Sequence, residues 1–295
     1  MNNRPAAVAG SWYPGSADAL AAAVDSHLAA AGDAPFQLTD LVALIAPHAG
    51  LVYSGPVAAY AYRQMRGRDI DLAVLVGPSH FIAFDGVAIC RRGGFETPLG
   101  VVDIDDECAS RLMEATPIVR EHPGAHAREH SLEMQLPFLG RLAPGAKIVP
   151  LLMGFQSAET ARALGEALGR VLRGRQALLV ASTDLSHYHD ASTARRLDAV
   201  VIDCVSHFDA DGLQRALDVR PDHACGGGPT VAVMRAAHLL GARDAVILKY
   251  ADSGDVSGDK SAVVGYLAAA LGNVAKSTTT EDTETTRGHR RTPAF

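Results

Sequence analysis

The chain has 295 residues, 48% of them hydrophobic, and a formal net charge of -6. That length can bury a large core, either as one α/β domain or as two small ones. With no Lys/Arg-rich run and no apolar stretch of the roughly 18–20 residues that cross a membrane, nucleic acid and membrane are excluded as expected partners. Residues 1–15 lack the long apolar segment of a secretory signal, so the sequence predicts a cytoplasmic protein.

Short apolar runs alternate with amphipathic helical patterns along the chain. The first helix is predicted over 16–31, where Leu20, Val24 and Leu28 recur every four residues. Further helices are predicted at 54–67, 105–115, 130–142, 157–173, 192–207, 209–218 and 229–240. Strands are predicted at 41–46, 72–76, 148–154, 177–182, 245–251 and 262–271, with a strand pair within 85–101. Continuous apolar runs indicate strands buried on both faces, so we expect an α/β fold with a mainly parallel central sheet and helices on both faces.

No linker divides the chain before about residue 272, which predicts a single α/β domain over 1–272. The remaining segment, 273–295, is polar and Thr-rich. It has too few large apolar residues to offset the entropy of ordering, and we expect a disordered tail. The cysteines show no dense framework, so free thiols are expected, and Cys90, Cys108 and Cys204 fit buried, inert positions.

Three predicted strands run into short loops that carry histidine. His48 follows the strand at 41–46, His80 follows the strand at 72–76, and Asp184 and His187 follow the strand at 177–182. In open α/β sheets ligands bind outside the carboxyl ends of the strands, so these side chains are expected to lie along one edge. One histidine alone is usually structural, whereas this set indicates a functional cleft. Spacing by itself leaves a metal site and a histidine acid/base site equally open.

Two further segments carry polar groups that could reach such a cleft. Cys225 precedes three glycines and a predicted helix, a position that favours a lowered thiol pKa, although a plain turn fits as well. Glu129, His130 and Glu133 begin an apolar helical pattern, either facing the cleft or only capping the helix.

The histidines at 122, 126 and 130 have helical four-residue spacing. Pro123 and Gly124 argue against a helix there, so we do not expect a metal-binding face.

Six segments resemble, in this order, the Memo family, whose bacterial and archaeal members are also called AmmeMemoRadiSam system protein B. The segments span about residues 4–271. Each one alone is modest evidence for the family, whereas the six together are highly specific. The segments are RPAAVAGSWYPG (4–15), APHAGLVYSGPVAAYAY (46–62), GPSHF (77–81), EHSLEMQLPF (129–138), STDLSHY (182–188) and ACGGGP (224–229).

The resemblance implies a fold similar to class III extradiol dioxygenases, with a non-haem iron site in the cleft. His48, His80 and Cys225 match the metal ligands of the family. Asp184 matches its nearby acidic residue, and His187 and His130 match polar positions that line the cleft. The implied cofactor is Fe(II), with Cu or Zn as alternatives, because thiolate is a soft ligand.

The resemblance leaves several functions open. One is an iron-dependent oxidoreductase of the extradiol type, with His187 or His130 as the base and Asp184 orienting a ligand. True extradiol enzymes use a carboxylate where this chain has a thiolate, so dioxygenase activity does not follow from the fold. The alternatives are a zinc-dependent hydrolase and a non-catalytic adaptor for iron or copper handling. The expected partners are a small molecule or peptide in the metal cleft, near Trp12 and Tyr53, and a radical-SAM protein suggested by the family name.

Overall fold

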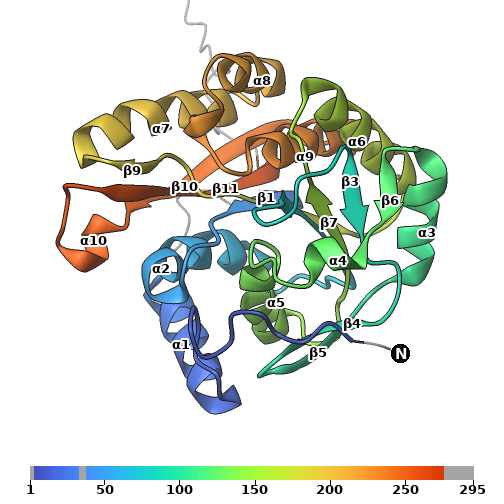
Figure 1. Ribbon diagram of the computed structural model, residues 1–295, viewed down its shortest axis with the longest axis horizontal. Helices are drawn as coiled ribbons and strands as arrows, with labels where there is room; N and C mark the ends of the chain where they lie inside the picture. The colour runs from blue at the N-terminus through green and yellow to red at the C-terminus, as the bar shows by residue number, and fades with distance from the viewer. Residues whose placement is uncertain (1–2, 33–37, 276–295) are drawn as a thin grey trace, which may run out of the picture.

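The computed structural model describes residues 3–32 and 38–275, and a nine-stranded sheet runs through its centre (Figure 1). Neighbouring strands follow an order that is not the order of the sequence, as in crossover α/β folds. That order is β10 (Asp244–Asp252), β11 (Val263–Val274), β1 (Leu38–Ala46), β8 (Leu178–Ser182), β2 (Leu72–Pro78), β7 (Lys147–Met153), β3 (Val87–Ile89) and β6 (Val119–Glu121). The short strand β9 (His187–His189) pairs with β11 beside this path.

The middle of the sheet is parallel, as predicted. Strands β1, β8, β2 and β7 pair in parallel, while β11 runs antiparallel to β1 and β3 antiparallel to β7. In the β1–β8 ladder Ala46 lies opposite Ser182, so both strands end at the same level. A separate hairpin is formed by β4 (Gly94–Thr97) and β5 (Gly100–Asp103).

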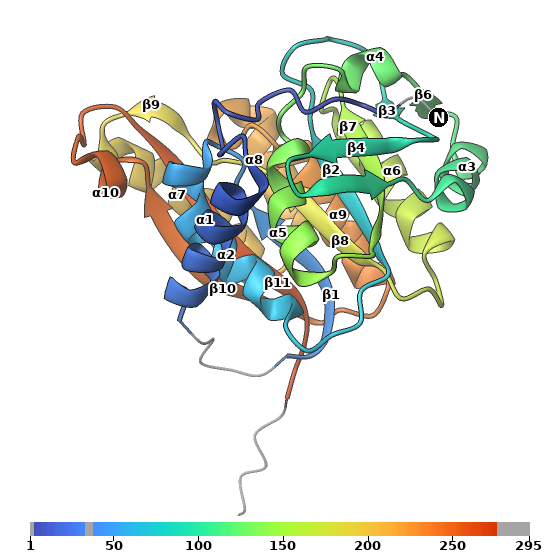
Figure 2. The ribbon, with the colours of Figure 1, turned by 90° about the horizontal axis from the view of Figure 1, so that it is seen from below.

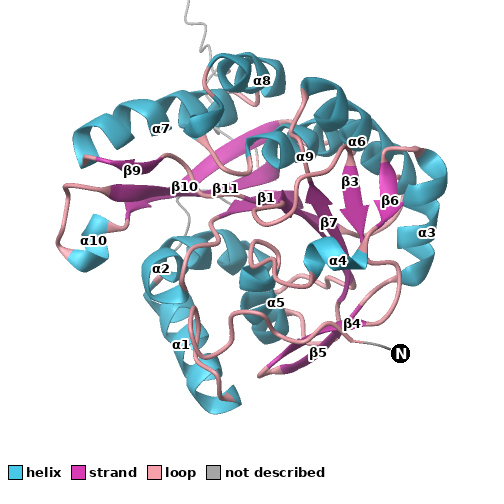
Figure 3. Ribbon diagram, viewed as in Figure 1, coloured by secondary structure: helices cyan, strands magenta, loops and turns pink. Residues whose placement is uncertain are grey.

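Helices cover both faces of the sheet, which confirms the predicted α/β architecture. One face carries α1 (Ala17–Ala30), α2 (Leu51–Tyr62) and α5 (Leu136–Leu142), seen in front of the sheet in Figure 2. The opposite face carries α3 (Asp106–Ala115), α6 (Ala158–Val171), α7 (Ala191–Ser206), α8 (Ala210–Val219) and α9 (Gly227–Leu239) (Figure 3). Successive strand residues point to opposite faces. Leu44 therefore packs in the core under α1 and α2, and Ile45 in the core under α6 and α9.

Several short elements differ from the predictions. The predicted helix at 130–142 is replaced by a 3-10 turn, η2 (Glu133–Gln135), followed by α5, and the N–H groups of His130 and Ser131 before it donate to Glu129. The predicted helix at 54–67 begins earlier, as α2, and ends in η1 (Arg63–Met65). A single helical turn, α4 (Pro123–His126), forms where no helix was expected, since proline suits a first helical position. The remaining short helices are η3 (Pro221–His223) and α10 (Gly254–Ser257).

Strand β11 continues through Val274, two residues into the segment predicted as a tail. The rest of that predicted disordered tail, from residue 276, lies outside the described residues. The single domain over 1–272 stays a prediction. Among the described residues no helix combines the length and the apolar character needed to cross a membrane.

Candidate metal centre

The loops after β1 and β8 are joined at the carboxyl edge of the sheet. The backbone N–H of His48 donates to Oδ1 of Asp184 at 2.7 Å, and the N–H of Thr183 donates to the carbonyl of Ala46 at 3.0 Å. Because the two strands are parallel and end together, these contacts hold His48 above the sheet edge. Ligands of open α/β sheets bind at this carboxyl edge.

The three predicted ligands converge at this edge. The ligand atoms of His48, His80 and Cys225 all lie within 4.8 Å of one another, and Nε2 of His48 is 3.2 Å from Sγ of Cys225. His48 is buried, whereas the side chain of His80 is 28% exposed. Two imidazoles and a thiol at this separation form a set that could hold a transition-metal ion, with one side facing the outside.

Glu129 holds His80 in place. Its Oε1 accepts a hydrogen bond from Nδ1 of His80 at 2.9 Å, and its Oε2 accepts the backbone N–H of His80 at 2.6 Å. Burial opposes ionisation of this carboxyl, but the hydrogen bonds from His80 and Ser131 lower the pKa of Glu129 to about 2. A carboxylate can only accept, so Nδ1 of His80 carries the proton and its Nε2 is free for a metal.

The pKa shifts of His48 and Cys225 both favour the neutral forms of these groups. Burial, together with the neighbouring His80, His130 and His187, lowers the pKa of His48 well below its ordinary value. Burial raises the pKa of the Cys225 thiol, and the nearby Asp184 carboxylate adds to this. The prediction of a lowered thiol pKa is therefore wrong for the metal-free chain, because burial outweighs the start of α9. Metal binding as a thiolate would release that proton.

The backbone around Cys225 is fixed from two sides. Gln156 donates from Nε2 to the carbonyl of Cys225 at 2.7 Å and accepts the N–H of Gly228 at 2.8 Å. A Cβ on Gly226 would lie 2.3 Å from the carbonyl oxygen of Ser182, so only glycine lets this loop approach β8 so closely. The tight loop places the thiol beside His48.

His130 lies against His80, deeper in the cleft. Its ring stacks on the His80 ring with centroids 4.7 Å apart and planes 14° apart, and the Trp12 ring lies 4.2 Å away on a tilted plane. Burial lowers the pKa of His130 to about 4. The ligand atoms of His80, Glu129 and His130 also lie within 4.8 Å of one another, but Glu129 already accepts hydrogen bonds from His80, His130 and Ser131.

The other two predicted site residues follow β8. Asp184 is buried, and burial raises its pKa to about 7 even though the N–H groups of His48 and Ala49 donate to it. His187 lies on β9, half-buried, and burial lowers its pKa while a hydrogen bond with the backbone of Leu185 opposes the shift. Their catalytic roles stay predictions.

Glu133 does not line the cleft. Its carboxylate is fully buried and accepts from the guanidinium of Arg4, from the N–H groups of Ala7 and Val8, and from the hydroxyl of Tyr13 at 2.6 Å. These contacts pin the N-terminal segment, dark blue in Figure 2, across the molecule from α4 towards α1. Glu133 therefore anchors the N-terminal segment that carries Trp12, a role that the sequence pattern did not reveal.

The histidines at 122, 126 and 130 do not form a metal-binding group among the described residues, as expected. Nε2 of His126 lies 3.3 Å from the carbonyl of Ala88, inside the core.

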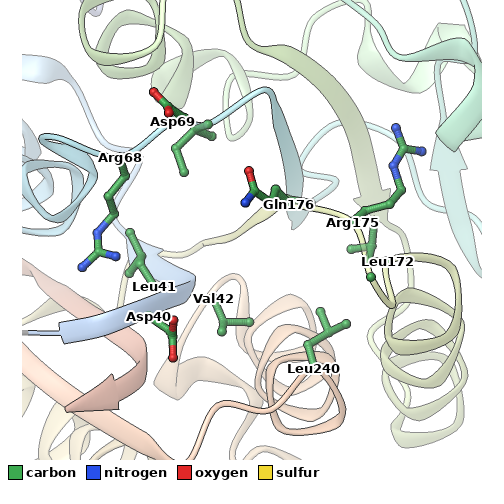
Figure 4. A pocket seen from close by; sticks show the side chains of 12 residues that line it. Asp40, Leu41, Val42, Arg68, Asp69, Leu172, Arg175, Gln176 and Leu240 are labelled. Carbon is green, nitrogen blue, oxygen red and sulfur yellow. The ribbon is translucent and has the colours of Figure 1, made fainter. Parts of the chain in front are cut away.

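Two cavities differ in whether they reach the cluster formed by His48, His80 and Cys225. One of about 390 Å³ lies at the amino ends of β1 and β8, where Leu41, Val42 and Leu240 line it and no histidine or cysteine does (Figure 4). Another of about 290 Å³ is lined by Phe155, Gln156, Gln214 and Cys225 and so reaches the ligand loop from the side of α8 and α9. Only the second touches the cluster.

Sequence comparison relates this chain to a known protein family. The model of the Memo-like protein family matches residues 4–270. A MEMO1 family protein of Methanosarcina mazei is 39% identical over 272 residues, covering 91% of this chain and 98% of its own. One of Methanothermobacter thermautotrophicus is 38% identical over 274 residues, covering 90% and 99%.

Structural comparison bears on the fold alone. The crystal structure of the uncharacterized protein JW3007 from Escherichia coli K12 is similar with a TM-score of 0.54 at 17% identity, covering 77% of this chain and 99% of that one. This likeness supports the α/β fold, and the family rests on the sequence matches. The chain belongs to the Memo-like protein family.

Proposed function

We propose that the protein binds one transition-metal ion, Fe(II), through Nε2 of His48, Nε2 of His80 and Sγ of Cys225. The observation that carries this proposal is the convergence of three donor atoms within 4.8 Å at the carboxyl edge of the sheet. The hydrogen bond of His80 to a carboxylate is the arrangement that orients metal-binding histidines in many proteins. Mixed imidazole and thiolate ligands suit Fe(II), Cu(I) and Zn, and the non-haem iron site that the family resemblance implies favours iron.

We propose further that the site serves an oxidoreductase acting on a small molecule. When bound, Fe(II) supplies Lewis-acid and electron-transfer chemistry. The side chains around it supply proton handling, because His187 and His130 have lowered pKa values and are neutral bases. Asp184 holds the His48 loop in place through the backbone N–H of His48. The rings of Trp12 and Phe81 lie beside the His130 ring, with centroids 4.2 and 6.0 Å from it.

Metal analysis of the natively purified protein tests the binding proposal. The wild-type chain is expected to retain one iron per chain, and Cys225→Ala to lose it together with any thiolate-to-metal absorption. Cys90→Ala is the matched control, because Cys90 is also a buried free thiol but belongs to no cluster of ligand atoms among the described residues. Undiminished metal in the Cys225 variant would refute the ligand assignment.

Oxygen uptake tests the oxidoreductase. The anaerobically iron-loaded protein is expected to consume oxygen with at least one member of a panel of catechols. Absence of uptake across the panel, with iron bound, would count strongly against this reaction.

Exposed aromatic side chains favour a second function, ligand binding without turnover. Trp12 and Phe81, whose rings contact His130, are 38% and 51% exposed, and Tyr53, in α2 after the His48 loop, is 41% exposed. Large exposed rings beside a cleft suit stacking on a peptide or an aromatic small molecule. Binding of a peptide library with no reaction of any member, lost in Trp12→Ala, would favour this adaptor function over the oxidoreductase.

A further inference from the structure

A buried chain of hydrogen bonds lies behind His48, on the side away from Cys225. Nδ1 of His48 is 2.8 Å from Oγ of Ser182, the last residue of β8. Ser182 Oγ is also 2.6 Å from the carbonyl oxygen of Ser131 and 2.8 Å from Nε2 of Gln135. Every residue in this chain is at most 1% exposed, so solvent does not compete for these bonds. The direction of each bond can therefore be worked out from the donors and acceptors present.

The orientation of Gln135 is set first. Its Nε2 lies 3.1 Å from the carbonyl of Pro47, which can only accept, and its Oε1 accepts the hydroxyl of Tyr62 at 2.8 Å. Turning the amide over would place Oε1 against the carbonyl oxygen of Pro47, and two acceptors repel. The amide nitrogen must therefore face Ser182 and donate to it.

The proton of Ser182 is set next. A serine hydroxyl has one hydrogen and two lone pairs. The carbonyl of Ser131 can only accept, so the hydrogen of Ser182 points to it. One lone pair then accepts from Gln135, and the other is left for His48. The partner of that lone pair has to be a donor, which requires a proton on Nδ1 of His48.

We infer that Ser182 and Gln135 are positioning residues that hold His48 as the Nδ1–H tautomer, leaving the lone pair of Nε2 directed at Cys225. The inference rests on the proposed function in one respect, that Nε2 is the metal-binding atom. The two imidazole ligands have different hydrogen-bond partners. His80 donates to a carboxylate, whereas His48 donates to a neutral hydroxyl. A carboxylate makes an imidazole a stronger donor than a hydroxyl does, so the two histidines are unequal ligands.

The tautomer can be read directly in the metal-free protein. Two-dimensional ¹⁵N–¹H spectra of the uniformly labelled wild-type chain, with His48 assigned by its loss in His48→Asn, are expected to show a protonated Nδ1 and a bare Nε2. Finding the proton on Nε2 would overturn the inference without any substitution in the network. In Ser182→Ala the proton is expected to redistribute between the two nitrogens.

Metal affinity gives the second readout, with Co²⁺ as the probe because its absorption reports thiolate ligation. Ser182→Ala is expected to weaken Co²⁺ binding by roughly 10–100-fold, the usual effect of removing such a partner. Ser182→Thr, which keeps the hydroxyl, is expected to restore both the tautomer and the affinity. Ser186→Ala is the matched control, since Ser186 is equally buried and, among the described residues, its hydroxyl makes no hydrogen bond to His48, Ser131, Gln135 or Ser182.

The outcomes separate this inference from the proposed function. A Ser182→Ala protein that keeps the Nδ1–H tautomer and full Co²⁺ affinity overturns the inference and leaves the metal site standing. A wild-type protein that binds no Co²⁺ or Fe²⁺ refutes the proposed function, and the tautomer of the metal-free chain still decides the inference. An equal loss of affinity in Ser186→Ala would show that the effect is only structural and would overturn it as well.

Discussion

The carboxylate of Glu129 contacts His80 twice, with Oε1 2.9 Å from the ring nitrogen Nδ1 and Oε2 2.6 Å from the backbone nitrogen. One side chain thus fixes both the loop that carries the ligand and the rotation of its ring. The same Oε1 accepts the N–H groups of His130 and Ser131. Glu129 therefore ties the His80 loop to the segment before η2.

Replacing Glu129 with Gln is expected to weaken metal binding by roughly 10–100-fold, as removal of such partners does. Both carboxylate oxygens accept N–H groups, so either orientation of an amide would set its NH₂ against a donor. Competition titration with Zn²⁺ or Co²⁺ measures the change. Glu121→Gln serves as the control, because Glu121 is exposed and its ion pair is with Arg91, at 3.6 Å. Equal affinities of the two variants would contradict the role given to Glu129.

A methyl group at Gly226 is expected to disturb the metal site without touching a ligand. Its Cβ would lie 2.3 Å from the carbonyl of Ser182, which belongs to backbone and cannot move far. The Cys225 loop would have to withdraw from β8, carrying the thiol away from His48. Gly226→Ala should therefore lose the thiolate-to-Co²⁺ absorption, whereas Gly145→Ala, where nothing lies within 4 Å, should keep it. An unaltered spectrum in Gly226→Ala would show that the loop is more tolerant than its packing indicates.

Removing the charge of Arg4 is expected to destabilise the whole protein. Arg4 and Glu133 form a buried ion pair, and loss of one partner leaves a buried carboxylate that costs about 3–5 kcal/mol. Urea unfolding of Arg4→Met measures the free energy of unfolding. Trp12, the single tryptophan, reports the N-terminal segment by its fluorescence. Arg91→Met should change the free energy of unfolding by less than about 1 kcal/mol, since its ion pair is partly exposed. A similar loss of stability in both variants would argue against the anchoring role of Arg4.

The sequence predicted the central architecture because its signals are local. The apolar runs that become β1, β2, β7 and β8 pair in parallel and are buried over most of their length, and such strands read as continuous hydrophobic segments. The helix at 130–142 was predicted too long, because only α5, from Leu136, is α-helical and η2 precedes it. The segment before η2 is tied through Glu129 to His80, a contact between distant segments that no local pattern reveals.

The candidate site was predicted only in part for the same reason. Strand-end placement nominated His48, His80, Asp184 and His187, and the family resemblance added Cys225. Ser182 and Gln135 lie within two of the segments that resemble the family, and no role was predicted for either residue. Their role depends on the alignment of β1 with β8, in which Ala46 lies opposite Ser182. The raised pKa of the Cys225 thiol was also out of reach, because burial is a property of the folded chain.

Substitution of His187 is expected to lower turnover and spare the metal. A general base contributes typically 10²–10⁴-fold to rate, and His187 has a lowered pKa and lies outside the ligand set. Oxygen uptake and iron content of His187→Asn are measured together with those of His189→Asn, a control on the same strand β9. Loss of iron in His187→Asn, or full turnover without His187, would contradict its role as the base.

The wide separation of the ligands along the chain has a consequence for biosynthesis. His48 and Cys225 are 177 positions apart, yet their side chains meet. A nascent chain that has emerged only as far as β8 carries both histidines but not the thiol, and so it cannot hold the ion in the full three-ligand set. Capture of the proposed ion by all three ligands would then follow synthesis of the segment that carries Cys225, and an ion that binds the folded chain more tightly than the unfolded one shifts the equilibrium towards the fold. Metal loading would thereby favour chains that have folded at least as far as this loop.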